Sequence, residues 1–419
     1  MSIPAVPAIE VRTVAETEFT DWVKAVGVGF LRPPVVSERF ARTLLDNTDL
    51  SRVQGAFDAG RCVATFRSFA QELTVPGGAA LPVSAVSNVT VSPTHRRRGL
   101  LTRMMAAELA AVRERGEAAS TLIADEYPIY GRYGYGPATS LTEWEIDVAR
   151  TGLDPHWSRP ADGGRVDLVD PAEAAKAGAE VFERFRPSQP GAISRDRRWW
   201  DLTTGAVRRD EPWTEPFFAV YRTAAGDPAG LAVYTADERW SDAKLPENTA
   251  TVKGLMGLTP EADRALWHYL CSIDWIRTVR TGYRAPDDLL PLYFPNPRAA
   301  KTVTHADFLW LRLLDVAAAL EARTYATDGA LVLEVLDATG PAAGRFLLET
   351  SGTGARCTPT TRTAELSLDV RELASLYLGD ESARRLFALG RVTEERAGAV
   401  ARTDDLFRTA RRPWCPDVF

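Results

Sequence analysis

The clearest pattern of apolar and polar positions lies between residues 86 and 112. Val86 and residues 89–91 are mostly β-branched, which is typical of a strand, and Pro93 ends the strand because proline has no N–H for a ladder. Beyond residue 100 the apolar positions recur at helical spacing, at Leu101, Met104, Met105, Leu109 and Val112. The pattern predicts a short strand, a basic turn and a helix in direct succession.

The residues around this stretch continue an alternation of helices and strands. Apolar residues at helical spacing predict a helix over residues 13–28, and Thr13 and Glu16 have the spacing of a capping box at its start. Further elements are a helix at residues 37–45 and strands at residues 54–57, 62–69, 72–75, 121–124 and 144–148. This order predicts an α/β fold for the first part of the chain.

A polar joint with glycine and proline at residues 150–164 predicts a domain boundary. A second α/β segment follows, with a helix at 171–185 and another that starts at Thr259 and Pro260 and runs in phase to Ile276. A third segment begins near Thr302 and contains strands at 308–313, 330–335, 345–349 and 364–368 and helices at 316–322, 370–378 and 382–389. With 419 residues, two or three domains are expected, and we assign them to residues 1–150, 151–300 and 301–419.

Composition narrows the class of protein. The net charge is −6, which opposes nonspecific binding to nucleic acid. The four cysteines and four histidines are scattered along the chain, so neither a metal site nor a disulfide framework is predicted. The N-terminus lacks the pattern of a signal peptide, and no apolar run is long enough to span a membrane. We therefore expect a cytoplasmic protein.

The basic turn between the strand and the helix is a candidate anion site. It reads Arg96-Arg97-Arg98-Gly99-Leu100-Leu101, and the helix that follows directs free N–H groups and the positive end of its dipole at the turn. Gly99 would let the backbone approach a phosphate closely. The alternative is a charged turn on a solvated surface. The glycine spacing matches neither a Walker loop nor a dinucleotide fingerprint.

This stretch resembles the coenzyme A loop of the GCN5-related (GNAT) N-acetyltransferases. The pattern is Arg96-x-x-Gly99-x-Leu101 after a strand and Pro93, and the run from Pro93 to Leu101 resembles the actinobacterial Eis (enhanced intracellular survival) branch. Leu101 departs from the broad family, in which Gly or Ala is commoner. The order Leu366-Ser-Leu-Asp-Val-Arg-Glu-Leu also resembles the sterol-carrier-like C-terminal domain of that branch. The resemblance implies two tandem GNAT domains, the second without a coenzyme A loop, and then a sterol-carrier-like α/β domain.

The resemblance also implies acetyl-CoA as cosubstrate, and assembly as a homohexamer. The positions that match the family's cofactor contacts are Val89, Thr90 and Val91 for the pantetheine, Arg97, Arg98, Gly99, Leu100, Leu101 and Thr102 for the pyrophosphate, and Asp125 and Glu126 at the end of the next strand. Phe30, Ser87 and Asn88 border the expected substrate pocket. No acidic run marks that pocket, although the family accepts polyamines such as aminoglycosides.

Acetyl transfer from a thioester to an amine requires a neutral amine, a polarised carbonyl and a proton for the leaving thiolate. No nucleophilic triad is indicated, so direct transfer is simpler than a covalent intermediate. Tyr130, in the element Tyr130-x-x-x-Gly134-Tyr135, matches the family's proton donor. The C-terminal carboxylate of Phe419 matches the base of the Eis branch, and the last six residues are unusually apolar for a tail. For Tyr130 and Phe419 the alternative reading is packing alone.

We therefore predict an N-acetyltransferase that acts on amines, with aminoglycosides as the first candidate acceptors. A second hypothesis keeps the chemistry but changes the acceptor to protein lysines, arylalkylamines or another metabolite amine. A third is a non-catalytic module that binds coenzyme A or a lipid, against which the intact loop and Tyr130 argue.

Overall fold

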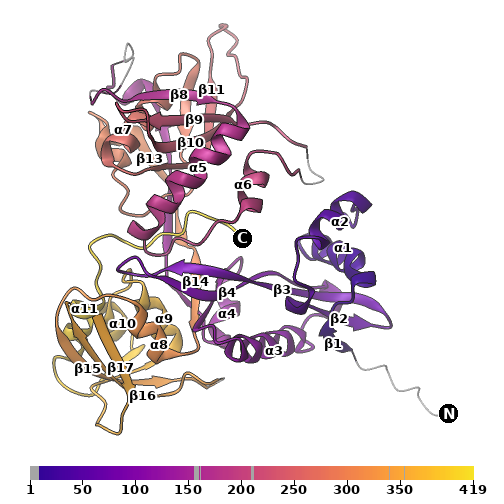
Figure 1. Ribbon diagram of the computed structural model, residues 1–419, viewed down its shortest axis with the longest axis vertical. Coiled ribbons are helices and arrows are strands. Elements are labelled where there is room, and N and C mark those ends of the chain that lie inside the picture. Colours follow the sequence, from indigo (N-terminus) through magenta and orange to yellow (C-terminus); the bar gives the residue numbers. More distant parts are fainter. Residues whose placement is uncertain (1–8, 155–159, 161, 209–211, 339, 353) are drawn as a thin grey trace.

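Three β-sheets with packed helices organise the part of the chain that the computed structural model describes, residues 9–154, 160, 162–208, 212–338, 340–352 and 354–419. Figure 1 shows the first sheet at the lower right, the second at the top and the third at the lower left. The predicted α/β class is confirmed. Among these residues no helix is long and apolar enough to cross a membrane.

The first sheet carries most of the predicted site. Its strands, in spatial order, are β1 (Glu10–Thr13), β2 (Val53–Asp58), β3 (Arg61–Thr74), β4 (Ala80–Val91), β5 (Ala119–Ile123), β14 (Leu309–Leu313) and β6 (Gly136–Pro137). Its helices are α1 (Phe19–Gly29), α2 (Glu38–Leu45), α3 (Leu100–Glu114) and α4 (Tyr127–Tyr130). The predicted strand, turn and helix of residues 86–112 are confirmed as β4, a loop and α3.

The N-terminal helix begins later than the sequence predicts. Residues Glu10–Thr13 form β1, which pairs with β2, and α1 starts only at Phe19. A 3-10 turn, η1 (Glu16–Glu18), precedes α1. The Glu18 carboxylate accepts a hydrogen bond from the N–H of Ala15, the N-cap of that turn, at 3.0 Å and pairs with Arg12 at 2.7 Å. The predicted capping box of Thr13 and Glu16 is wrong because Thr13 belongs to a strand.

The second sheet contains β13 (Ala300–Asp307), β7 (Ser140–Asp147), β12 (Ile276–Arg280), β11 (Asn248–Gly257), β10 (Pro228–Ala236), β9 (Phe217–Arg222) and β8 (Arg165–Val169). Its helices are α5 (Pro171–Phe185), α6 (Arg197–Thr203) and α7 (Pro260–Cys271). The α5 bounds match the prediction. The α7 prediction extends too far, since the helix ends at Cys271 and Ile276 opens β12, which pairs in parallel with β11.

Two strands pair in a different sheet from the one that their segment of the sequence suggests. The strand expected near residues 144–148 is β7, which pairs with β12 and β13 in the second sheet. In turn β14, from the third segment, lies between β5 and β6 in the first sheet. Apolar alternation identifies a strand but not its partner, so this exchange depends on packing across the whole chain.

The third sheet is β17 (Gly354–Pro359), β16 (Gly344–Ser351), β15 (Gly329–Leu336), β18 (Leu366–Asp369) and β19 (Val392–Glu394), with α8 (Val316–Ala322), α9 (Val370–Tyr377), α10 (Ala383–Ala388) and α11 (Ala399–Phe407). Its core is continuous with β14 and with the tip of the β3–β4 hairpin, through Leu73, Val83 and Leu311. Short 3-10 turns are η1 (Glu16–Glu18), η2 (Leu50–Arg52), η3 (Pro93–His95), η4 (Gly131–Tyr133), η5 (Val148–Arg150), η6 (Arg186–Ser188), η7 (Leu290–Tyr293) and η8 (Pro297–Ala299).

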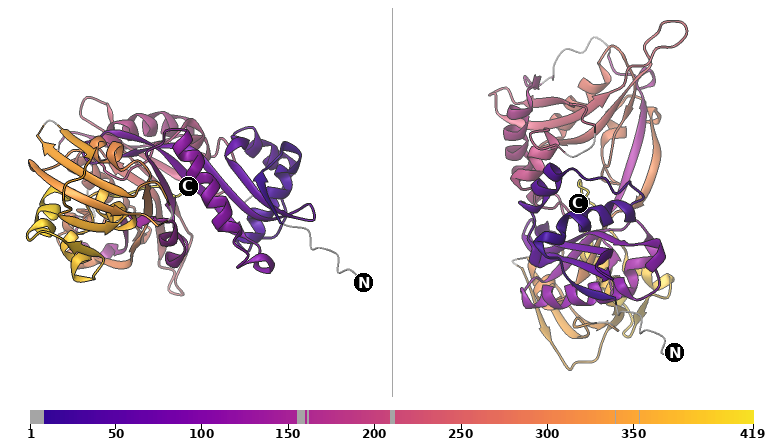
Figure 2. Two further views of the ribbon diagram at one scale, coloured as in Figure 1. Left: turned by 90° about the horizontal axis from the view of Figure 1, so that it is seen from below. Right: turned by 90° about the vertical axis from the view of Figure 1, so that its right-hand side faces the viewer.

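The C-terminal tail, residues 408–419, leaves the third sheet and returns to the centre of the molecule. Figures 1 and 2 show the C-terminus between the first and second sheets. The Trp414 N–H donates to the Pro190 carbonyl at 2.8 Å, and the Trp414 ring packs against Phe185 on α5. This tail is therefore an ordered, internal part of the fold.

Candidate active site

The first sheet opens between its two parallel strands. Strands β4 and β5 pair from Val83 with Ala119 to Val86 with Leu122, and no pairing continues beyond Val86. Strand β4 nevertheless runs on to Val91, with β3 along its other side. Backbone groups of residues 87–91 that face away from β3 are therefore available to a ligand.

A β-bulge marks the start of this opening. Arg67 on β3 pairs with Ser87 on β4, but Thr65 pairs with Thr90, so β4 has one extra residue. Asn88 takes up the bulge with φ of 52°, a left-handed conformation that asparagine tolerates better than most residues. The Thr65 hydroxyl donates to the Asn88 carbonyl at 2.8 Å, which holds the bulge in shape.

The loop after β4 forms an open helix N-terminus. Arg97 and Gly99 both have left-handed backbones, with φ of 61° and 72°, and Gly99 is the N-cap of α3. Gly99 has no side chain to cap this helix, so the first N–H groups of the helix, at residues 100–102, are free to bind an anion. His95 anchors the loop through a 2.9 Å contact with Asp58.

Tyr130 lies at the end of α4 on the face of the first sheet that α3 covers. It belongs to the same apolar cluster as Val86, Leu100 and Met104 and is 8% exposed. Burial, together with the neighbouring carboxylates of Asp125 and Glu126, raises the pKa of Tyr130 to about 12. The phenol therefore stays protonated at neutral pH, as a proton donor must.

Phe419 lies on the opposite face. Val86 pairs with Ser68, so these two side chains share the α3 face, and the alternation of a strand directs Arg67 and Phe69 to the other face. The Phe419 ring contacts the Phe69 ring edge to face, with centroids 5.9 Å apart. The Tyr130 side chain and the Phe419 ring thus lie on opposite faces of the first sheet, near the place where β4 and β5 separate.

The residues predicted for the substrate pocket surround the same opening. Phe30 ends α1 and is 41% exposed, and the preceding Gly29 packs so closely on Thr90 that a side chain would overlap it. Ser87 and Asn88 are half-buried on the bulge, while Asp125 and Glu126 are exposed at the end of β5.

Residues that sequence reasoning missed are Arg67, Phe69, Arg195 and Asp417. Among the described residues Arg67 makes no hydrogen bond or ion pair, and its guanidinium lies 5.2 Å from the Phe69 ring centre. Burial, with Arg198 nearby, lowers the pKa of Arg67 to about 10, so it remains charged at neutral pH. The sequence indicates Arg67 only by its position, as a charged residue within the apolar run of residues 62–69.

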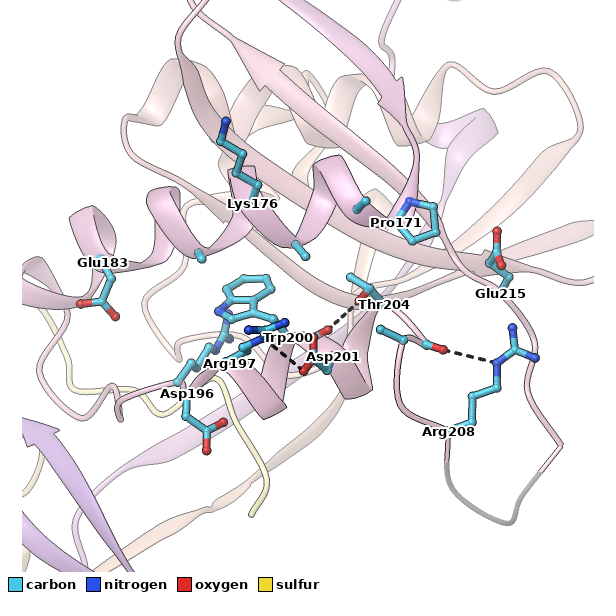
Figure 3. A pocket seen from close by; sticks show the side chains of 16 residues that line it. Pro171, Lys176, Glu183, Asp196, Arg197, Trp200, Asp201, Thr204, Arg208 and Glu215 are labelled. Atoms are coloured by element: carbon cyan, nitrogen blue, oxygen red, sulfur yellow. Dashed lines mark hydrogen bonds and ion pairs between the residues drawn. The ribbon is translucent and has the colours of Figure 1, made fainter. Parts of the chain in front are cut away.

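A cavity of about 800 Å³ lies elsewhere, between α5 and α6 of the second domain. Figure 3 shows Lys176 and Glu183 on one side and Trp200 and Asp201 on the other. Neither Tyr130 nor Phe419 lines it. Among the described residues no cluster of side chains is suited to hold a metal ion.

Comparison with known proteins gives the class to which this architecture belongs. The profile of an acetyltransferase (GNAT) domain matches residues 10–138, a second GNAT profile matches residues 191–313, and a sterol carrier protein domain profile matches residues 316–416. The protein is an N-acetyltransferase with two GNAT domains and a sterol-carrier-like third domain, as the sequence predicts.

Relatives identify the branch. An uncharacterized N-acetyltransferase of Streptomyces avermitilis is 62% identical over 412 residues, 98% of this chain and 99% of the relative. The N-acetyltransferase Eis of Mycobacterium tuberculosis is 37% identical over 341 residues, 80% of each chain. The crystal structure of Eis1 from Mycobacterium abscessus matches with a TM-score of 0.83 at 32% identity and covers 98% of this chain and 100% of the other. The chain belongs to the Eis family of N-acetyltransferases.

Proposed function

We propose that the protein transfers the acetyl group of acetyl-CoA directly to an amine at the opening between β4 and β5. The observation that carries this proposal is that the parallel pairing stops at Val86 while β4 continues to Val91. Through this gap a thioester on one face of the sheet can meet an amine on the other. Holding the two reactants together supplies much of the rate enhancement of such a transfer.

In this proposal acetyl-CoA occupies the first domain. The free N–H groups at residues 100–102, with Arg97 and Arg98, bind the pyrophosphate, and the free edge of residues 89–91 pairs with the pantetheine amides. The corresponding helix of the second domain is unsuited to this role. The Thr259 side chain accepts from the Ala262 N–H, and Pro260 occupies the first turn, so fewer donors are free.

The chemical step uses one group from each face of the sheet. The nitrogen lone pair of the amine attacks the thioester carbonyl carbon, and a backbone N–H of residues 87–91 stabilises the negative charge on its oxygen. The C–S bond then breaks, Tyr130 donates a proton to the sulfur, and the Phe419 carboxylate accepts a proton from the nitrogen. Exchange with water restores both groups. Phe419 is half-buried. Its carboxylate becomes a stronger base when the bound acceptor displaces the water that solvates it.

The acceptor is proposed to be an amine of the aminoglycoside class. One observation favours a second class, amines that carry an aromatic or acidic group. Arg67 and Phe69 lie on the Phe419 face. Among the described residues Arg67 makes no ion pair, and Asp196 acts on it only at longer range, so its positive charge repels a polycation and attracts an anion. A panel of aminoglycosides, arylalkylamines and acidic amines, assayed for coenzyme A thiol release, ranks these acceptors.

The terminal carboxylate is tested by moving it. A protein with three glycines added after Phe419 should lose at least about a hundredfold in kcat, because a small displacement of a reacting group has an effect of this order. Its KM for acetyl-CoA should stay within about twofold, since the extension moves the proposed base and leaves the N–H groups at residues 100–102 in place. Thiol release under saturating acetyl-CoA measures both constants.

The same assay on Tyr130→Phe should also show a kcat at least about a hundredfold lower, the usual contribution of a positioned acid. The extended chain and the variant should keep the thermal stability of the parent, which controls for misfolding. Unchanged turnover after the extension would exclude the carboxylate as the base. If none of the amines in the panel causes thiol release although acetyl-CoA binds, a non-catalytic binding module is favoured.

A further inference from the structure

The last residues of the tail are held by a buried ion pair. Both carboxylate oxygens of Asp417 accept hydrogen bonds from Arg195, at 2.9 Å from one terminal nitrogen and at 3.0 and 3.2 Å from Nε. The two side chains are only 7% and 4% exposed. Such a two-point contact between planar groups defines direction as well as distance. Asp417 is two residues before the terminal carboxylate.

Aromatic rings fix the arginine of this pair. The Arg195 guanidinium lies 3.8 Å from the ring centres of both Phe182 on α5 and Trp199 on α6. A guanidinium between aromatic faces gains cation–π attraction and loses most of its rotational freedom. Every group that orients Arg195 in this way belongs to the second domain.

The backbone before Arg195 is attached to the strand that carries the other half of the site. Thr74 on β3 donates to Ala192 and accepts from Gly191, both at 2.8 Å, and the Ser194 N–H donates to the Glu72 carbonyl at 2.9 Å. Strand β3 also carries Phe69, on which the Phe419 ring rests. One rigid strand therefore positions Arg195 and the ring of the last residue together.

Between these two attachments the tail has little freedom. Val418 is 61% exposed, and the residues on either side of it are the ones held, Asp417 by Arg195 and Phe419 by Phe69. Two residues span at most about 7 Å, so fixing Asp417 restricts the terminal carboxylate to a small volume.

We propose that Arg195 is a positioning residue for the catalytic carboxylate of Phe419, acting through Asp417. The second domain, whose own helix N-terminus is capped, thereby contributes to the chemistry of the first. This inference rests on the proposed role of the carboxylate as base. The ion pair acts on the orientation of the carboxylate and leaves cofactor binding untouched.

The test compares Asp417→Asn and Arg195→Lys with a matched control in the full chain. Asparagine keeps the size and one acceptor of Asp417, and lysine keeps the charge of Arg195 but loses the two-point contact. The control is Glu117→Gln, which breaks the Arg52–Glu117 pair of comparable burial in the first domain, away from the tail. All three variants should lose some thermal stability.

Of the three variants, only Asp417→Asn and Arg195→Lys, here called the tail variants, should lose turnover. We expect kcat to fall at least about tenfold in Asp417→Asn and Arg195→Lys, with the KM for acetyl-CoA within about twofold, because misorientation affects the chemical step. Glu117→Gln should keep the parent kcat. Parent kcat in both folded tail variants would overturn the proposal.

Chemical rescue gives a second, independent readout. Arg195 lines the cavity between α5 and α6, so in Arg195→Ala a free guanidinium ion can enter the vacated space beside Phe182 and Trp199. Millimolar guanidinium should raise kcat of this variant severalfold, and methylammonium should not. A kcat that responds to neither ion, in a folded variant, would contradict positioning by Arg195.

The outcomes separate the two proposals. If the extension after Phe419 abolishes turnover and the tail variants do not, the carboxylate is the base but Arg195 does not position it. If the extension leaves turnover intact, the proposed base itself is wrong.

Discussion

Individual residues in this protein have their chemistry set by burial more than by their neighbours in sequence. Tyr130 is one of three tyrosines within six positions, and its sequence context resembles that of Tyr135. Desolvation raises the pKa of both phenols, but the Tyr135 hydroxyl bonds to Ser120 at 2.7 Å inside the core. Tyr130 instead lies beside the carboxylates of Asp125 and Glu126, next to the strand opening. Location thus separates a candidate acid from a packing residue.

The buried Asp263 on α7 should make the stability of the protein depend on pH. Desolvation raises its pKa to about 7, although Arg284 opposes the shift, and one of its carboxylate oxygens is buried without a hydrogen bond. The folded state therefore binds this proton more tightly than the unfolded state, whose carboxyl has a pKa near 3.8. The contribution of this bound proton to the free energy of unfolding is therefore complete below about pH 4 and is lost as the pH rises through 7.

The variant Asp263→Asn should remove this dependence. At pH 8 we expect the variant to gain on the order of 4 kcal/mol in unfolding free energy, since it no longer buries a charge. At pH 4 the parent and the variant should be nearly equal. Urea unfolding at both pH values measures the difference, and an equal gap at pH 4 and pH 8 would contradict the assignment.

At the scale of elements, similar strand–turn–helix units have different capacities for anions. Helix α3 starts after Gly99, which has no side chain to cap it, so its first N–H groups are free. Helix α7 starts after Thr259, whose side chain caps the helix, and its first residue is Pro260, which has no N–H. Both follow a strand that pairs in parallel with the strand after the helix. The cofactor is therefore proposed for the first unit only, on the basis of capping chemistry.

The loop prediction is tested by Gly99→Ala. The left-handed backbone of Gly99 costs alanine roughly 1 to 2 kcal/mol, and relief of that strain would shift the N–H groups at residues 100–102. We expect the KM for acetyl-CoA to rise about fivefold to tenfold, with kcat at saturation nearly unchanged.

Gly116, just after the other end of α3, provides a matched control. Its φ is 71° against 72° for Gly99, and an added Cβ would have open space at both positions. Gly116→Ala should lose similar stability without a change in KM for acetyl-CoA. Equal KM changes in the two variants would mean that the loop has no specific role.

At the scale of the whole molecule, the three sheets depend on one another. Strand β14 fills the first sheet between β5 and β6, while β7, directly after β6, belongs to the second. Arg195 and Asp417 connect positions 222 residues apart. The first GNAT sheet is therefore incomplete without residues from beyond position 300.

A fragment of residues 1–150 should therefore fail to fold cooperatively. Without β14 it would expose the backbone edge of β5 and the apolar side chains of β7 that otherwise pack in the second core, including Trp144 and Ile146. Circular dichroism should show no cooperative thermal transition in the fragment, in contrast to the full chain. A sharp transition with native-like near-ultraviolet signal would contradict this dependence.

The sequence alone determined the α/β class, the positions of most helices and strands, and the strand–loop–helix of residues 86–112. These features follow from local spacing, since apolar periodicity and turn residues act over a few neighbours. Residues 171–185 form the predicted helix because proline, an aspartate cap and one apolar face agree within that stretch.

Only the tertiary structure decided which strands pair and which residues meet around the opening. The exchange of β7 and β14, the contact of the Phe419 ring with Phe69, and the contact of Asp417 with Arg195 all join segments that are distant in sequence. No local pattern encodes such partners, because each depends on the packing of the whole chain. The loop at residues 96–101 could be predicted from the residues next to it in sequence. The contacts that hold the last residues of the chain could be identified only from the folded structure.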